Sequence, residues 1–404
     1  MTKAGEPANT SPSIGRFAAF DARNFRLYFG GQVLSTVGSW SQTLAVTSLV
    51  LEITGESAQL GITVALQFLP MLLLGAVAGV AADRFDNRSI LLITSFLQAS
   101  LAALYGVLAH TGNVSILTID AITVAFGVVG AFERPTMQTF VPQLVPPDHA
   151  HSAITMANTV NGTARMAGPA LAGFLVKHAG VTVCFFVNSA SFGIVFVALA
   201  CMRVREIRAR EMLSRTSRGI RNGLAYVRAN AAVRTPILVM VVIGTVAYNF
   251  LVTVPSIVRF TFGHGADAMG LVFGVSSVGT LLGAYLAAKA LPTGRRLALS
   301  LTIMCAALCS LGLAPNFGWF VASMVPMGMS SAYLQAMLVS TLQRESDPVM
   351  RGRVMSLYQI AWQGTTPIGT PIMGIVAQAT SPRMPFVLAA LAAAACAVAL
   401  ATAS

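Results

Sequence analysis

The chain has 404 residues, of which 55% are hydrophobic and only 10% are charged, and it carries a formal net charge of +12. A soluble protein has about 25% charged residues, so this composition excludes an ordinary soluble domain and indicates that lipid surrounds most of the surface.

Twelve apolar stretches have roughly the 20-residue length that a membrane-spanning helix needs. In chain order they lie near Leu27–Leu51, Leu60–Ala82, Ile90–Ala109, Ile116–Phe132, Ala153–Val176, Val181–Met202, Ile237–Val258, Met269–Ala288, Leu297–Ala314, Phe317–Leu342, Val354–Gln378 and Pro385–Ala403. Backbone groups in lipid must be hydrogen-bonded internally, so runs of this length are expected to be helical. The expected fold class is an all-α membrane protein with twelve transmembrane helices in two six-helix bundles.

A single long hydrophilic stretch interrupts the apolar spans, at Arg203–Arg234 after the sixth one. Within it Ile220, Leu224 and Val227 share one helical face, which predicts a surface helix at the membrane interface. The chain is therefore expected to divide into an N-terminal six-helix bundle (1–202), a basic cytoplasmic linker (203–234) and a C-terminal six-helix bundle (235–404).

The two predicted bundles echo each other. Gly168–Gly173 in the fifth span reappears as Gly369–Gly374 in the eleventh, roughly two hundred residues later. Repeated half-transporters related by an axis along the membrane normal give such echoes, and small residues at these positions predict close helix packing.

Basic residues are concentrated on one side of the predicted membrane. Turns on the same side as both termini hold most of the arginines, whereas the opposite turns hold few cations such as Lys177 and Arg383. This positive-inside asymmetry predicts cytoplasmic termini in a bacterial inner membrane. It accounts for the net charge without a nucleic-acid partner. The polar Met1–Arg26 segment predicts no cleavable signal.

A turn dense in charge joins the second and third spans. It contains Gly79, Asp83, Arg84 and Arg88. The glycine predicts a close helix approach, and the charges can exchange ion pairs as helices shift.

Twelve spans, a basic central loop and this turn resemble the major facilitator superfamily. Five further motifs resemble its drug and siderophore exporter branch, which includes the enterobactin exporter and macrolide efflux proteins: Asn24–Leu27, Gly31–Ser35, Gln67–Pro70, Glu133–Pro135 and Arg351–Ser356. Asp86 and Ser89 depart from the superfamily's pattern at the turn, where a glycine and a second basic residue are commoner.

The resemblance implies a conformational latch. Asp83 is expected to hold the two halves together on the inner side when the cavity opens outward, with Arg84 and Arg88 beside it. It is a candidate to cap the N-terminus of the eleventh helix near Gly352–Met355, where the helix dipole favours an anion. Glu133 and Arg134 are candidates to join this network.

Polar residues follow helical stripes inside several spans, where facing hydrocarbon would be unfavourable. The predicted substrate-cavity residues are Gln32, Ser35, Ser39, Gln42, Asn158, Asn161, Tyr248, Asn249, Gln359, Trp362 and Gln363. The alternative for each is an interhelical hydrogen bond. Met324, Met327, Met329 and Met337 in the tenth span suit either varied cargo or core packing.

Asp120 and Arg165 are the candidates for proton coupling. Each is expected on the order of 20 Å from the inner end of its helix, where an unpaired charge is costly. The hypothesis is that the two residues pair and that protonation of Asp120 loosens the pair. The alternatives are a permanent structural pair, or an Asp120 solvated near the outer headgroups.

The predicted function is secondary active export of bulky amphiphilic small molecules, such as drugs or siderophore-like compounds, by proton antiport with alternating access. The expected partners are the substrate, protons and membrane lipid, and the expected state is a monomer. Neither catalytic residues, a metal site nor a cofactor is expected, so the chain is predicted not to be an enzyme. The alternatives are an importer or lipid flippase on the same scaffold, a non-transporting membrane sensor, and a membrane enzyme, for which the histidines are too scattered.

Overall fold

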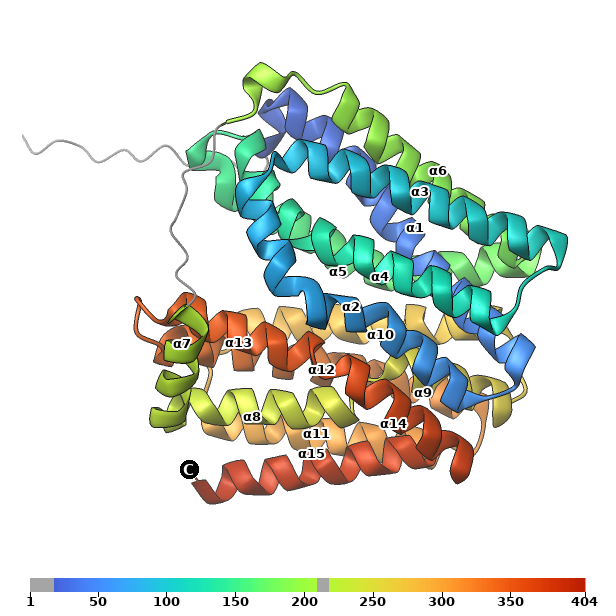
Figure 1. Ribbon diagram of the computed structural model, residues 1–404. Helices are drawn as coiled ribbons and strands as arrows, with labels where there is room; N and C mark the ends of the chain where they lie inside the picture. The colour runs from blue at the N-terminus through green and yellow to red at the C-terminus, as the bar shows by residue number, and fades with distance from the viewer. Residues whose placement is uncertain (1–17, 209–217, 404) are drawn as a thin grey trace, which may run out of the picture.

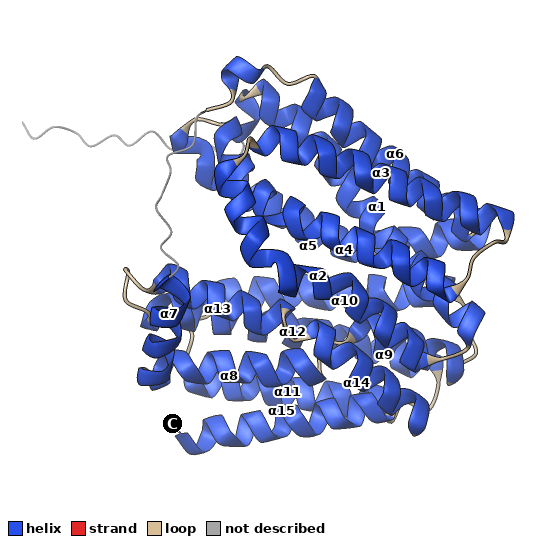
Figure 2. Cartoon of the chain, in the orientation of Figure 1, coloured by secondary structure: helices blue, strands red, loops and turns tan. Residues whose placement is uncertain are grey.

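The computed structural model describes residues 18–208 and 218–403, and every regular element in these two ranges is a helix (Figures 1 and 2). The first six long helices are α1 (Arg23–Thr54), α2 (Ser57–Arg84), α3 (Asn87–Thr111), α4 (Ile116–Phe140), α5 (Ala150–Ala179) and α6 (Val181–Ala200). The remaining helices are α7 (Arg218–Ala229), α8 (Ala231–Val246), α9 (Phe250–Phe260), α10 (Ala266–Ala288), α11 (Gly294–Gly312), α12 (Phe317–Glu345), α13 (Arg351–Gln363), α14 (Thr366–Ala379) and α15 (Met384–Ala403). Short 3₁₀ turns lie at Ala18–Asp21, Val141–Leu144, Pro147–His149 and Val204–Glu206.

The long helices run roughly along one direction and gather in two groups, α1–α6 and α8–α15 (Figure 1). The short α7 lies across one end of the second group. We call this the linker end. It holds the start of α1, the turn between α2 and α3 and the C-terminal end of α15. The opposite end, where α1 turns into α2, is the far end.

Eight helices in the described ranges are long and apolar enough to cross a membrane. They correspond to α2, α3, α4, α6, the α8–α9 pair, α10, α11 and α15. The helices α1, α5 and α12 carry more polar residues, and α13 and α14 are short. The fold class is therefore confirmed as all-helical, and the number of twelve spans stays a prediction that this architecture fits.

Two of the predicted spans are broken rather than continuous. The stretch predicted as Ile237–Val258 divides into α8 and α9 at residues 247–249, and Val354–Gln378 divides into α13 and α14 at residues 364–365. Pro367 is the second residue of α14. Because proline has no N–H to continue an upstream helix and is tolerated in a first turn, the helix restarts there. Broken helices at membrane depth are tolerated where protein surrounds them.

The glycine repeat is confirmed as a set of close helix approaches. A Cβ added at Gly168 would lie 2.4 Å from the Cβ of Trp40 in α1, and one at Gly369 would lie 2.2 Å from a carbonyl oxygen of α8. The second glycine of each repeat faces the other half: Gly173 packs on α10 and Gly374 on α2. The repeat therefore forms matching contacts in both halves.

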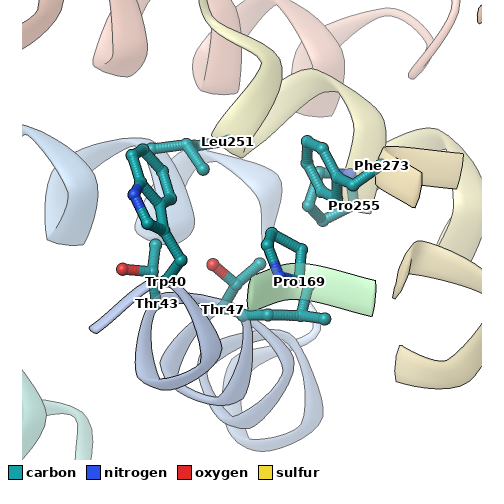
Figure 3. A pocket seen from close by; sticks show the side chains of 8 residues that line it. Trp40, Thr43, Thr47, Pro169, Leu251, Pro255 and Phe273 are labelled. Carbon is teal, nitrogen blue, oxygen red and sulfur yellow. The ribbon is translucent and has the colours of Figure 1, made fainter. Parts of the chain in front are cut away.

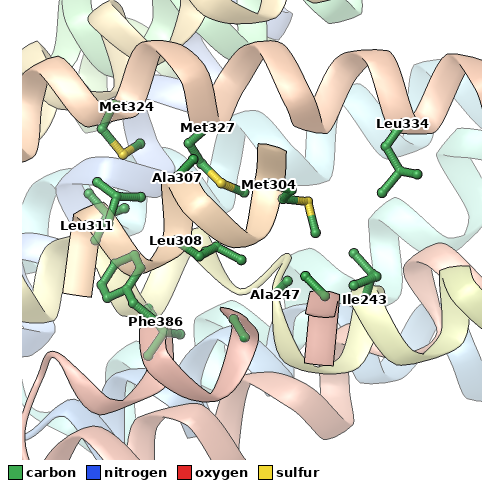
Figure 4. Close-up of a cluster of buried hydrophobic side chains, with 14 of the residues drawn as sticks. Ile243, Ala247, Met304, Ala307, Leu308, Leu311, Met324, Met327, Leu334 and Phe386 are labelled. Atoms are coloured by element: carbon green, nitrogen blue, oxygen red, sulfur yellow. The ribbon is translucent and has the colours of Figure 1, made fainter. Parts of the chain in front are cut away.

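Three of the four methionines of α12 belong to the core of the second group, and Figure 4 shows Met324 and Met327 there. Met324, Met327 and Met337 are buried, and Met304 of α11 and Phe386 of α15 lie in the same apolar cluster. Core packing, and not a cargo surface, explains these three side chains.

Candidate functional site

At the far end the two groups of helices pack tightly. The backbone N–H of Ala58 in α2 donates to Oε1 of Gln378 in α14 at 3.0 Å. On the other side of the molecule, Nζ of Lys177 in α5 lies 3.2 Å from Oδ2 of Asp267 in α10. Between these polar contacts the glycines described above bring α2 against α14 and α5 against α10. The far end is therefore closed.

A small apolar cavity marks the inner edge of this closure (Figure 3). Its volume is about 10 Å³, and it is lined by Trp40, Thr43, Leu44, Thr47, Pro169, Leu251, Pro255 and Phe273. These residues come from α1, α5, α9 and α10, so both halves contribute. A cavity of this size has room for about one water molecule, which is far less than an organic molecule needs.

The linker end of α2 is arranged differently. The helix contains Pro70, and its C-terminal end rises toward α3 and away from α13 (Figure 1). A Cβ added at Gly75 or Gly79 would meet nothing within 4 Å, and the side chain of Leu73 is 67% exposed. The expectation that Gly79 marks a close helix approach is therefore wrong in this conformation. The two halves touch at the far end and separate along this part of α2.

Two residues of the charged turn form hydrogen bonds within the first group of helices. Oδ2 of Asp86 accepts hydrogen bonds from the backbone N–H and the hydroxyl of Ser89, at 2.8 and 2.7 Å, and so caps the N-terminus of α3. The guanidinium of Arg88 donates to the carbonyl oxygens of Leu199 and Ala200, at 2.9 and 3.1 Å. It therefore satisfies carbonyl groups at the C-terminal end of α6, where the helix dipole favours a cation.

The predicted latch residues lie on either side of the separated region. Asp83 is half-buried near the end of α2, and Arg84 is exposed. The α13 helix begins after Met350, whose side chain makes no capping hydrogen bond, and a Cβ added at Gly352 would meet only open space. The contact between Asp83 and α13 stays a prediction for another conformation.

One hydrogen bond joins the halves between the two ends. Nη1 of Arg134 in α4 donates to Oε1 of Gln363, the last residue of α13, at 3.2 Å. The same guanidinium lies 5.9 Å from the centre of the Phe68 ring, a cation–π distance. The neighbouring Glu133 instead accepts from Nε2 of Gln98 in α3 at 2.7 Å. Arg134 therefore faces the other half, while Glu133 faces its own.

Asp120 lies in the second turn of α4, close to the far end. Its carboxylate accepts a 2.6 Å hydrogen bond from the hydroxyl of Thr63 and a 2.9 Å bond from Nε2 of Gln59, both in α2. These two partners were not predicted from the sequence, although their spacing of four residues places them on one face of α2.

The pairing of Asp120 with Arg165 gains no support from helix packing. The α4 helix packs on α2 and α3, whereas α5 packs on α1, α6 and α10. Arg165 belongs to α5, but its side chain lies outside the described ones, as do those of Asn158 and Asn161. The ion pair stays a prediction.

The polar stripe of α1 divides between two environments. Gln42 is buried, and its Oε1 accepts from Nδ2 of Asn188 in α6 at 2.8 Å, so the interhelical alternative holds for this residue. The hydroxyl of Ser39 donates to the carbonyl oxygen of the buried Ser35. Gln32 is half-buried and reaches Thr36 and the sulfur of Met137 in α4.

The remaining predicted cavity residues flank the two helix breaks. The hydroxyl of Tyr248 donates to the carbonyl oxygen of Ser331 at 3.3 Å, and Asn249 is buried and donates to the carbonyl oxygen of Thr245 at 2.7 Å. Next to the other break, Gln359 is exposed and Trp362 is half-buried. No group of three His, Cys, Asp or Glu side chains that could hold a metal ion occurs in the part of the chain that the structure describes.

A family model described as transmembrane secretion effector matches residues 14–404. The chain belongs to this family of the major facilitator superfamily. Macrolide efflux protein A of Streptococcus pyogenes is 22% identical over 375 residues, which cover 87% of this chain and 89% of the relative. The multidrug efflux pump Tap of Mycobacterium tuberculosis is 23% identical over 378 residues, covering 89% of this chain and 88% of the pump.

A solved structure shares the fold. A bacterial homologue of the human lysosomal transporter Spinster, in an inward-facing and occupied conformation, matches with a TM-score of 0.74 and 15% identity, covering 94% of this chain and 96% of that one. The chain is thus an integral membrane transporter of the major facilitator type, with relatives that are named as efflux proteins.

Proposed function

We propose that this transporter exports bulky amphiphilic small molecules, such as drugs or siderophore-like compounds, by proton antiport with alternating access. The observation that carries the proposal is the unequal closure of the two ends. Gly61 and Gly173 lie at helix contacts between the halves at the far end, whereas Gly75 and Gly79 face open space nearer the linker end. Such a structure corresponds to one of the two states that rocking halves alternate between. The efflux relatives favour export.

The proposed orientation places the linker end in the cytoplasm of a bacterial cell. Arginines gather there, as in the run Arg203, Arg205 and Arg208, which agrees with the positive-inside rule. In this orientation the structure is open toward the cytoplasm, and both termini are cytoplasmic. Residues 1–202 and 235–404 are the proposed rocking halves of a monomer, joined by the linker 203–234.

In the proposed cycle the far-end contacts break when the linker end closes. The ion pair between Lys177 and Asp267 and the packing of α2 on α14 hold the present state. Closure would bring the end of α2 toward α13, and Asp83 would then meet the N-terminal dipole of that helix. The latch would then stabilise the outward-open state.

The proposed cargo site lies near the contact between Arg134 and Gln363. This contact joins the halves next to the α13–α14 break, and discontinuous helices commonly form the binding sites of transporters. Phe68 adds aromatic surface next to it, and Trp362, which precedes Gln363 in α13, is proposed to do the same. Closely placed aromatic and polar groups suit amphiphilic molecules.

Asp120 is the proposed proton-coupling carboxylate, with Gln59 and Thr63 as its hydrogen-bond partners in the present state. The ionised carboxylate accepts two hydrogen bonds from α2. Protonation would make it a weaker acceptor and so loosen α4 from α2. Uptake driven by a proton gradient in inverted vesicles measures this role. The Asp120→Asn variant is expected to lose the response to the gradient, and unchanged coupling would eliminate the role.

A compound screen tests the function as a whole. A deletion strain is expected to accumulate drugs or siderophores that the complemented strain expels, and a protonophore is expected to abolish the difference. Uptake in inside-out vesicles gives the direction. Accumulation in right-side-out vesicles would instead identify an importer, and movement of labelled phospholipid alone would identify a flippase.

A further inference from the structure

A groove of about 610 Å³ runs along the contact between α5 and α10, starting at the far end. Mostly small and apolar residues line it: Ala170, Gly173, Phe174, Lys177, His264, Asp267, Ala268, Gly270, Leu271, Gly274, Val275, Val278 and Phe317. The residues assigned above to the cargo site and to proton coupling do not line this groove, so it is a separate feature.

Polarity divides sharply along the groove. Its charged residues, Lys177 and Asp267, both lie at the far end, where they form an ion pair with side chains 59% and 43% exposed. His264 lies at the same end, with its ring 4.4 Å from that of Phe317. Below this rim the lining is apolar, and Val278 is 54% exposed.

The length of the apolar part matches one leaflet of a bilayer. Val278 follows Asp267 by eleven positions in α10, a rise of about 16 Å. Half of a hydrocarbon core is about 15 Å thick. A charged rim followed by an apolar groove of this depth has the profile of a phospholipid that stands with its head at the far end and its acyl chain along the helices.

We propose that this groove binds one phospholipid whose zwitterionic head carries a primary amine, as in phosphatidylethanolamine. The paired cation and anion complement such a head, because Lys177 suits the phosphate and Asp267 suits the ammonium group. A primary ammonium donates hydrogen bonds to a carboxylate, whereas the quaternary ammonium of phosphatidylcholine has no N–H to donate. A glycerol head offers no cation to Asp267.

The bound lipid also favours one conformation. The floor of the groove is the contact between Gly173 and Gly270, where a Cβ added at Gly173 would lie 3.0 Å from the α carbon of Gly270. This contact exists only while the far end is closed. A lipid that needs both walls therefore binds this state in preference to the open one, and so shifts the population toward it.

Native mass spectrometry of the full chain, with equal amounts of phosphatidylethanolamine, phosphatidylcholine and phosphatidylglycerol added, tests the proposal. The wild type is expected to retain phosphatidylethanolamine about threefold better than either competitor, a ratio in keeping with partly exposed charges. Asp267→Asn is expected to bring phosphatidylethanolamine and phosphatidylcholine to parity. Lys177→Gln is expected to lower retention of both.

Lys289→Gln is the control, because it removes a lysine that lies outside the groove, at the linker end of α10. It is expected to leave the lipid preference unchanged. Equal retention of the three lipids by the wild type, or a preference that survives Asp267→Asn, would overturn the proposal. Displacement of the lipid by a transported drug would assign the groove to cargo instead. The readout needs no transport, so it stands apart from the test of the proposed export.

Discussion

The closure of the far end makes a quantitative prediction at Gly61. In Gly61→Ala the new Cβ would lie 2.5 Å from the carbonyl oxygen of Thr370 and 3.0 Å from the α carbon of Pro371, whereas ordinary contact begins at 3.4 Å. Both neighbours are backbone atoms of α14, so α2 and α14 must move apart by roughly 1 Å. Overpacking of this kind costs about 1–3 kcal/mol.

That free energy applies only to the state in which the two helices touch. The ratio of far-end-open to far-end-closed molecules is therefore expected to rise by roughly 5- to 150-fold. Hydrogen–deuterium exchange in nanodiscs measures the change, as faster exchange around residues 55–61 and 370–380 and slower exchange around 79–90.

Gly75→Ala is the matched control on the same helix. Its Cβ meets nothing within 4 Å, so it is expected to stabilise the helix by about 0.5–1 kcal/mol without the shift in exchange. If Gly61→Ala exchanges like the wild type and like this control, the close packing of α2 on α14 does not hold the far end closed.

Three further predictions concern the polar contacts. Arg134→Ala and Gln363→Ala are each expected to slow transport in vesicles by about tenfold, because each removes the same charged hydrogen bond. The double variant is therefore expected to be little slower than either single variant, and additive losses would contradict the contact. Arg88→Ala is expected to lower the free energy of unfolding by about 1 kcal/mol, since the end of α6 loses its cation, which thermal unfolding in detergent measures; an unchanged midpoint would remove that role. Asp83→Asn is expected to slow transport while leaving membrane insertion intact, and full transport activity would count against the latch.

Some features of the site followed from local sequence. The glycine repeat at 168–173 and 369–374 predicted close packing correctly, because only glycine admits a neighbouring backbone so near. The charged turn was located correctly between α2 and α3. The sequence did not predict that Asp86 caps α3 or that Arg88 caps α6. A cap on a distant helix depends on how the chain returns to it.

The residues that face one another across helices were harder to predict. Gln42 and Asn188 are 146 positions apart, and nothing in either helix by itself says that they meet. Asp120 was singled out because a carboxylate in an apolar span is rare, but its partners Gln59 and Thr63 depend on the packing of α4 on α2. A polar stripe gives the face of a helix and not the identity of its neighbour.

The sequence by itself determined that this chain is a helical membrane protein, because 10% charged residues and long apolar runs leave helices as the arrangement that satisfies the backbone in lipid. The positions of the basic residues along the chain also predicted its orientation in the membrane. Only the tertiary structure decided which end is closed. The closure depends on glycines of α2 and α5 meeting helices from the other half, and contacts between helices that are far apart in the sequence follow from packing and not from local pattern.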